Sequence, residues 1–162
     1  MFSISIPPNA SAYRLTNARV PVCLVADAAQ LKPDADGLAP CDIVIDNGRI
    51  AAIGPVGGAK DDLASVDLDR GMVLPRLVDI HTHIDKGHIW PRAQNPNGTH
   101  LGARTAVMAD RQANWSAEDV RRRMDFALRC AFAHGTGALR THIDSYPGQT
   151  AITWPLFAEM RE

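Results

Sequence analysis

The stretch that decides the fold runs from Leu74 to Lys86 and reads LPRLVDIHTHIDK. The apolar run after its proline is typical of a β-strand buried on both faces, as in a parallel sheet or barrel. Side chains two residues apart on a strand point to the same side, so we expect His81 and His83 to project together, about 7 Å apart along the strand. Two imidazoles in this arrangement can bind one metal ion, and zinc, iron, nickel and copper all accept imidazole.

A second segment, Gly135–Asp144, reads GTGALRTHID and again predicts a strand, over 138–144, that ends in a histidine and a carboxylate. The motifs HTHIDK and RTHID, in this order and separated by a helical segment, resemble the first two barrel strands of the amidohydrolase superfamily. Within that superfamily they are similar to the cytosine deaminase-like branch, which includes N-isopropylammelide hydrolases. The family usually has glycine and an aromatic residue after the proline, where this chain has Arg76 and Leu77. This departure from the family pattern affects the expected turn before the strand and not the pair of histidines.

The resemblance implies an α/β fold, namely the N-terminal part of a metal-dependent (β/α)8 TIM barrel preceded by a small β-sandwich. Residues 1–72 are then the N-terminal part of the sandwich, and residues 73–162 are the first β/α units of the barrel. A TIM barrel needs about 250 residues and one βα unit roughly 30, so we expect a barrel that this chain cannot close by itself. The chain is then the N-terminal part of a longer protein, a natural truncation or one piece of a split chain.

The resemblance also implies chemistry for the complete protein. One divalent ion, iron or zinc, activates water for hydrolysis of a C–N bond, and the expected reaction is deamination of a cytosine-like or triazine-like heterocycle. Hydrolysis of a cyclic amide or of an N-substituted amine is the alternative within the superfamily. A further alternative is an inactive fragment or assembly subunit that needs a partner chain.

Candidate site residues follow from the two motifs. His81 and His83 are the predicted metal ligands, and His142 and Asp85 are the predicted catalytic groups. The expected substrate rim consists of Lys86, His88, Trp90 and Asp144.

Each of these functional assignments has a structural alternative. Asp85 and Lys86 would otherwise pair with each other or with loop groups, and His142 and Asp144 would form a hydrogen-bonded structural pair. Asp79 is the acidic residue of the first strand that lies nearest the closed end of the barrel. Burying its carboxylate inside the barrel would cost free energy unless the carboxylate is paired. We therefore expect an Asp79–Arg140 ion pair.

Helices are expected between and after the two motifs. Ser116 can cap a helix over 116–134, with Gly135 at its C-terminal end. Its predicted apolar face includes Val120, Met124 and Phe132. Its arginines are expected to be solvated: Arg121, Arg122, Arg123 and Arg129. A short helix is expected within 101–114, and another over 149–161 with Pro155 in its first turn.

Before residue 72 the chain is expected to be rich in β-strands, over 13–20, 42–46, 49–54 and 66–69. Asn47-Gly48 between two apolar runs is a strong hairpin signal, because a type I′ turn needs positive φ at both positions.

Composition narrows the class of partner. The formal net charge is −1 and 46% of residues are hydrophobic, so nothing favours nucleic acid or membrane as partner. Three cysteines without CxxC spacing favour reduced thiols and a cytoplasmic location. The expected partner is a small heterocyclic substrate, and open sheet edges would suit a homo-oligomer or a complementary C-terminal segment.

Overall fold

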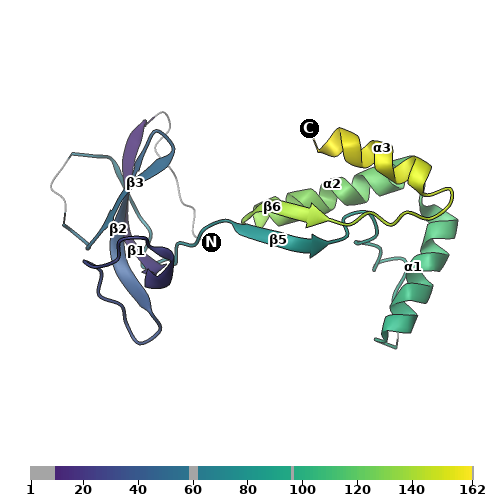
Figure 1. Ribbon diagram of the computed structural model, residues 1–162, viewed down its shortest axis with the longest axis horizontal. Helices are drawn as coiled ribbons and strands as arrows, with labels where there is room; N and C mark the ends of the chain where they lie inside the picture. The colour runs from purple at the N-terminus through teal and green to yellow at the C-terminus, as the bar shows by residue number, and fades with distance from the viewer. Residues whose placement is uncertain (1–9, 59–61, 96, 162) are drawn as a thin grey trace. The chain divides into compact units, whose positions relative to one another are not determined.

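The structure is a computed structural model that describes residues 10–58, 62–95 and 97–161. The chain divides into two compact units, Met1–Pro75 and Arg76–Glu162. Each unit has its own buried cluster. Figure 1 draws the backbone of both units.

The first unit is a four-stranded sheet with the order β3-β2-β1-β4. Antiparallel pairs join β1 to β2 and β2 to β3, whereas β4 runs parallel to β1. The strands and the short 3₁₀ helix that follows β1 are β1 (Ala12–Pro21), η1 (Val22–Leu24), β2 (Leu38–Asp46), β3 (Arg49–Gly54) and β4 (Ser65–Asp67).

Local sequence explains this sheet. Asn47 and Gly48 have φ of 48° and 73°, so the predicted hairpin turn between β2 and β3 is confirmed. Along β2 the apolar residues Ala39, Cys41 and Ile43 alternate and are buried; Asp42, between two of them, is also buried and accepts the backbone N–H groups of Asn17 and Gly57. That period of two places one face of the strand in the core, as expected for a sheet covered on one side.

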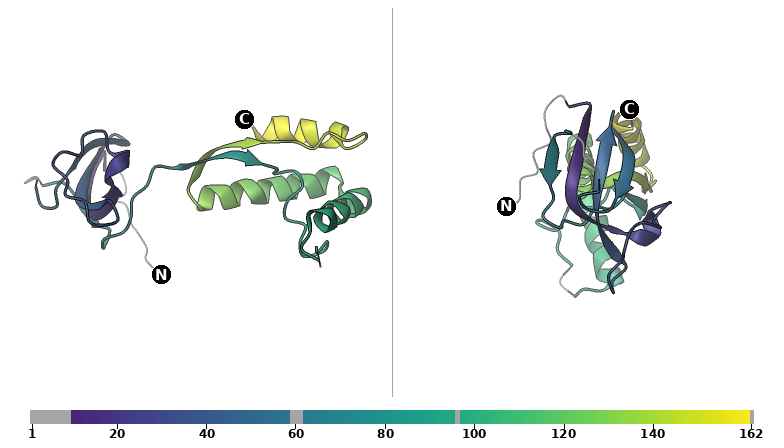
Figure 2. Two further views of the ribbon diagram at one scale, coloured as in Figure 1. Left: turned by 60° about the horizontal axis from the view of Figure 1, so that its bottom comes forward. Right: turned by 90° about the vertical axis from the view of Figure 1, so that its left-hand side faces the viewer.

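The second unit is a mixed α/β arrangement around a parallel pair of strands, β5 and β6. Figure 1 and the left view of Figure 2 place α1 beyond the C-terminal ends of these strands, while α2 packs against β6 and α3. The elements are β5 (Leu77–Thr82), α1 (His100–Asn114), α2 (Ala117–Ala133), β6 (Thr136–Thr141) and α3 (Thr150–Met160).

Helix α2 has the predicted ends. The side chain of Ser116 accepts a hydrogen bond from the backbone N–H of Asp119 at 3.2 Å, and Gly135 follows the helix with φ of 83°. Val120 and Met124 are fully buried, in a cluster with Leu156 of α3, Trp115 and Ile84, which follows β5. Phe132, which was predicted on the same apolar face, is 78% exposed; it lies in the last turn of α2, outside this buried cluster.

Two predictions about helical residues need correction. Arg123 was expected among solvated arginines, but it is buried because its guanidinium binds backbone carbonyls after β5. Pro155 is the sixth residue of α3 and not part of a first turn. Since proline lacks an N–H, it leaves the helix short of one backbone hydrogen bond there.

Two predictions about the strands also need correction. Strand β5 is not buried on both faces, since Val78 is 65% and Ile80 75% exposed. The physical reason is that β5 has β6 as its only strand neighbour within the described residues. Strand β6 ends at Thr141 and not at residue 144, so His142 and Asp144 follow the strand and are free of its alternation.

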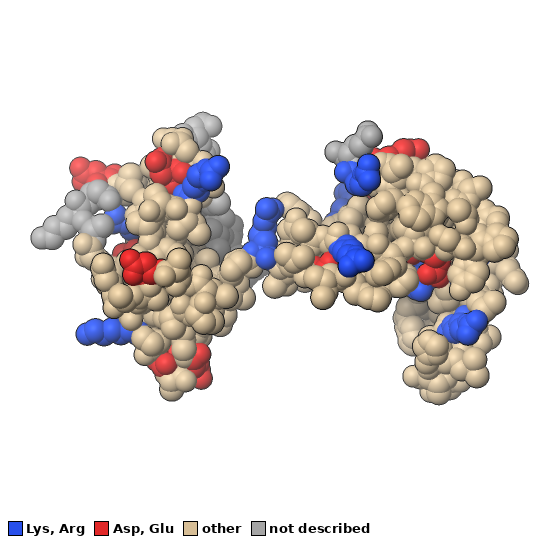
Figure 3. Space-filling model, in the orientation of Figure 1, with Lys and Arg blue, Asp and Glu red and all other residues tan. Residues whose placement is uncertain are grey.

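The face drawn in Figure 3 shows scattered blue and red side chains and no broad area of one sign. This agrees with the net charge of −1. Among the described residues, no helix has the length and apolar character needed to cross a membrane.

Candidate active site

Three histidines meet where β5 and β6 end. The ring centroids of His81, in β5, and of His83, which follows the end of β5 at Thr82, are 5.7 Å apart. His142, from the segment after β6, lies 4.3 Å from His81 and 5.4 Å from His83. The backbone explains this approach, because the N–H of His142 donates to the carbonyl of Thr82 at 2.8 Å and brings the two segments together.

The electrostatic surroundings favour a neutral His142. Desolvation lowers the pKa of His142 below its ordinary value, and the nearby His81 and His83 lower it further. A neutral imidazole has a free lone pair, which can accept a proton or bind a metal ion.

Two carboxylates join the ends of the strands. The Oδ2 atom of Asp85 accepts the backbone N–H of Asp144 at 2.8 Å. The Asp85 side chain is fully buried, and its Oδ1 has no hydrogen-bond partner among the described residues. Burial raises the pKa of Asp85, and the N–H of Asp144 partly opposes this shift.

Asp144 is shared by several groups and does not pair with His142. Lys86 donates to both of its oxygens, at 3.0 and 3.3 Å. Nδ1 of His83 lies 3.3 Å from Oδ1 of Asp144 without the geometry of a hydrogen bond, and this buried atom has no hydrogen-bond partner among the described residues. Asp85 and Lys86 therefore do not pair with each other; both bind Asp144 in the loop after β6, which is the second form of the structural alternative.

The spacing of the imidazoles can be compared with that required by a metal ion. A zinc–nitrogen bond of about 2.1 Å puts each ring centroid about 3 Å from the ion, and two such centroids about 5 Å apart at a tetrahedral angle. The separations of 5.7 and 5.4 Å around His83 fit this value, and 4.3 Å is somewhat short. The unpartnered Nδ1 of His83 also suits a ligand role. However, the described residues contain no group of three or more His, Cys, Asp or Glu side chains placed to hold an ion.

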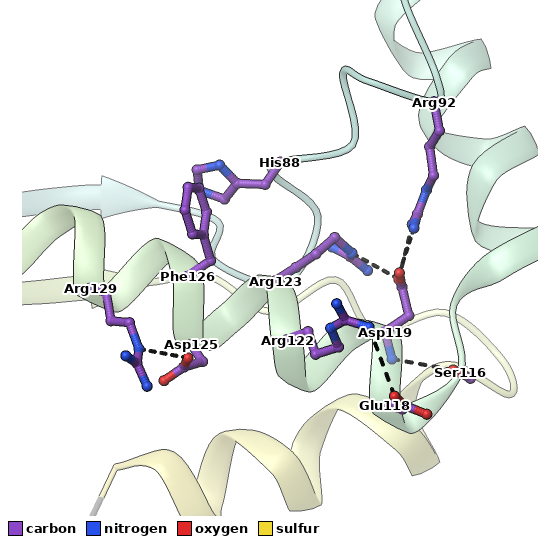
Figure 4. A pocket seen from close by; sticks show the side chains of 10 residues that line it. All are labelled: His88, Arg92, Ser116, Glu118, Asp119, Arg122, Arg123, Asp125, Phe126 and Arg129. Atoms are coloured by element: carbon purple, nitrogen blue, oxygen red, sulfur yellow. Dashed lines mark hydrogen bonds and ion pairs between the residues drawn. The ribbon is translucent and has the colours of Figure 1, made fainter.

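The other expected rim residues lie elsewhere. His88 has φ of 61° and packs edge-on against Phe126 of α2, with ring centroids 4.8 Å apart. It lines a hollow of about 850 Å³ along α2, shown in Figure 4, where charged side chains largely pair with each other. Trp90 is 60% exposed.

The expected Asp79–Arg140 ion pair is wrong for the described structure, in which no ion pair joins these residues. The Asp79 carboxylate instead accepts the backbone N–H of His81 at 3.0 Å. This bond satisfies the carboxylate locally on an exposed strand, so no buried partner is required.

Two arginines that sequence reasoning missed, Arg123 and Arg92, fix the loop that follows β5. Arg123 donates to the backbone carbonyls of Asp85 and of Gly87, the latter at 3.3 Å. Its Nε donates to Asp119 at 2.9 Å, and its guanidinium lies 4.5 Å from the centroid of the Trp115 ring. Figure 4 shows Asp119 between Arg123 and Arg92.

Arg92 extends this network to α1. It donates to the fully buried carboxylate of Asp110 at 2.7 and 2.9 Å, and Trp115 Nε1 donates to the same carboxylate at 2.8 Å. The loop after β5 is thus fixed to both helices. The bonds from Arg92 to Asp110 and from Arg123 to the loop carbonyls join residues 18 to 38 positions apart, so no local spacing signals them.

Comparison with known proteins supplies relatives of the chain. No protein-family model matches it. It is 49% identical over 161 residues to a pterin deaminase of Rhizobium rhizogenes, covering 99% of this chain and 36% of the relative. Among solved structures it is similar to N-isopropylammelide isopropylaminohydrolase of Burkholderia multivorans, with a TM-score of 0.61 and 25% identity over 94% of this chain and 34% of the other.

A second solved structure, 5-methylcytosine deaminase of Klebsiella pneumoniae, matches with a TM-score of 0.62 and 20% identity over 91% of this chain and 32% of the other. At that identity the likeness concerns the fold alone. The chain therefore spans about a third of the length of each of these three relatives.

Proposed function

We propose, because the chain is similar to the N-terminal part of amidohydrolase-superfamily deaminases, that the complete protein is a metal-dependent hydrolase that deaminates a flat heterocycle. The resemblance predicted from the two motifs is confirmed by these relatives. The observation that carries the proposal is the meeting of His81, His83 and His142 at the ends of β5 and β6.

The architecture of the complete protein is part of this proposal. Residues 1–72 would belong to a β-sandwich, and residues 73–162 would supply the first units of a (β/α)8 barrel. The parallel pairing of β5 and β6 and the helices between them support this assignment. Barrel enzymes carry their chemistry at the C-terminal ends of the strands, where the imidazoles lie.

We assign roles by position. His81 and His83 would hold a divalent ion, iron or zinc, together with ligands from outside the described residues. When bound, the ion supplies a water molecule of lowered pKa. His142, as a neutral imidazole, would accept a proton near the reacting ring. Asp85 would hold the two strand ends in place through the Asp144 backbone N–H.

The substrate would be a heterocycle with an exocyclic amino group. A relative named for pterin and a fold neighbour named for 5-methylcytosine make pterin, cytosine and triazine rings the first candidates.

The exposed Val78 and Ile80 of β5 favour a further proposal about assembly, in which a complementary segment or a partner chain covers this strand.

The test combines metal content with ammonia release. Purified full-length protein would be analysed for bound zinc and iron, then assayed on pterin, cytosine and aminotriazines. We expect about one metal ion per chain, ammonia release from at least one ring, and loss of both in His81→Ala and His83→Ala. His134→Gln, on an exposed histidine at the end of α2, is the matched control. Unchanged metal content in both alanine variants, or no ammonia from any ring, would contradict the proposal.

A further inference from the structure

A second hollow adjoins the imidazoles and is not used by the proposed chemistry. It has a volume of about 420 Å³ and is lined by α1, by Lys86 after β5 and by the segment after β6. It shares Asp144 with the candidate active site, since that carboxylate lies 3.3 Å from Nδ1 of His83. A group bound at the imidazoles could therefore extend into this hollow.

The lining carries more positive than negative charge. Lys86, Arg104 and Arg111 contribute cations, and Asp144 contributes the one carboxylate of the lining. Lys86 lies 3.0 Å and Arg111 3.5 Å from that carboxylate. No ion pair of the described residues involves Arg104. One carboxylate cannot neutralise these cations, so the hollow attracts an anion.

Arg111 is held in place but retains its hydrogen-bond donors. Its side chain is 12% exposed and lies between two aromatic rings, 3.7 Å from the centroid of Tyr146 and 5.1 Å from that of Trp115. Its contact with Asp144, 3.5 Å from the terminal nitrogen Nη2, is an ion pair and not a hydrogen bond. Nε is buried and has no partner within the described part of the chain, so a ligand in the hollow would meet the terminal nitrogens. A fixed guanidinium with free donors suits a carboxylate, which it can bind with two parallel hydrogen bonds.

The remaining lining suits an aromatic ligand. Tyr146 and Met108 give the hollow an aromatic and an apolar surface beside the cations. Arg111 and His83 both contact Asp144, so a substituent on a ring at the imidazoles reaches the guanidinium.

We propose that this hollow binds a carboxylate substituent of the heterocyclic substrate, with Arg111 as the principal contact and Lys86 and Arg104 adding positive charge. The inference rests on the proposed function and refines it, because it names anionic heterocycles as the preferred substrate class. Arg111 is then a specificity residue and takes no part in proton transfer.

The experiment compares two isosteric substituents on one ring. Full-length protein would be assayed with pterin, pterin-6-carboxylate and pterin-6-carboxamide, measuring kcat/KM for ammonia release and Kd from tryptophan fluorescence. Since a hydrogen bond to a charged group typically corresponds to a factor of ten or more, we expect wild type to prefer the carboxylate to the carboxamide at least about tenfold. Arg111→Gln should bring this ratio close to one, and Arg104→Gln, on an exposed helical residue, should lower it by a smaller factor.

The control is Arg129→Gln, which removes one positive charge from the exposed face of α2 and should retain the preference. Equal values for carboxylate and carboxamide in wild type would overturn the inference while leaving deamination intact. An unchanged ratio in Arg111→Gln would also overturn it, and if that variant does not fold, an unchanged ratio in Arg104→Gln decides in the same way. If no pterin is deaminated, the proposed deaminase activity on pterins fails. The ratio of the Kd values for pterin-6-carboxamide and pterin-6-carboxylate then tests the hollow by itself.

Discussion

Replacing Arg123 by methionine should destabilise the second unit far more than the same change at the adjacent Arg122. The Arg123 side chain is 7% exposed, and it holds Asp119, two backbone carbonyls after β5 and the face of Trp115. Methionine keeps the apolar length of the stem but removes every donor.

The magnitude follows from what is left unpaired. Breaking a buried ion pair typically costs about 3–5 kcal/mol. Asp119 keeps its bonds to Arg92, so we expect the lower end, about 3 kcal/mol. The Arg122 side chain is 79% exposed and lies 3.9 Å from an exposed Glu118, so Arg122→Met should change the free energy of unfolding by no more than about 0.5 kcal/mol.

Urea denaturation of the full-length protein, followed by tryptophan fluorescence and far-UV circular dichroism, measures the difference. With a denaturant dependence of about 1–3 kcal/mol per molar urea, the midpoint of Arg123→Met should fall by about 1–3 M. Equal midpoints for the two variants would refute the reasoning, because they would mean that the loop after β5 does not depend on the Arg123 contacts.

Two further predictions concern acid stability and the end of α2. Burial alone would raise the pKa of Asp110, but hydrogen bonds from Arg92, Trp115 and Asn114 outweigh it and lower that pKa; hydrogen bonding to Arg92 likewise lowers the pKa of Asp119. Because the unfolded chain binds protons more readily, the free energy of unfolding should fall as pH drops below about 4, and less steeply in Asp119→Asn; equal slopes in an acid titration would contradict this. Gly135→Ala should lower the unfolding free energy by about 1 kcal/mol because φ is 83°, while Gly135→Asn, which tolerates that φ better, should cost less; thermal unfolding of both variants checks the order.

Much of the fold could be predicted because its signals are local. Ser116 and Gly135 mark the ends of α2, and Asn47-Gly48 marks the hairpin. These residues act on backbone atoms only a few positions away, so their effect depends little on the rest of the molecule.

The misses share the opposite cause. Helical spacing gave no reason to separate Arg123 from Arg122, because the carbonyls that bury Arg123 are 36 and 38 residues away. The sequence pattern of β5 indicated burial on both faces. Burial of a strand depends on its neighbours, and within the described residues β5 has β6 as its only neighbouring strand. That His81 and His83 lie close together was predictable from their spacing of two residues, although β5 ends at Thr82, between them. The contribution of Arg111 to a basic hollow depends on how α1 is placed.

The bond between the Asp85 carboxylate and the Asp144 backbone N–H bears on how the site is made during synthesis. Its two ends are 59 residues apart, and the side chains that hold the same loop, Asp110 of α1 and Arg123 of α2, come from helices that lie between them in the chain. Segments of a growing chain can fold as they leave the ribosome, N-terminal parts first. The half of the site that carries the three imidazoles can thus form from one continuous stretch of chain, and later segments would meet a binding surface already in place.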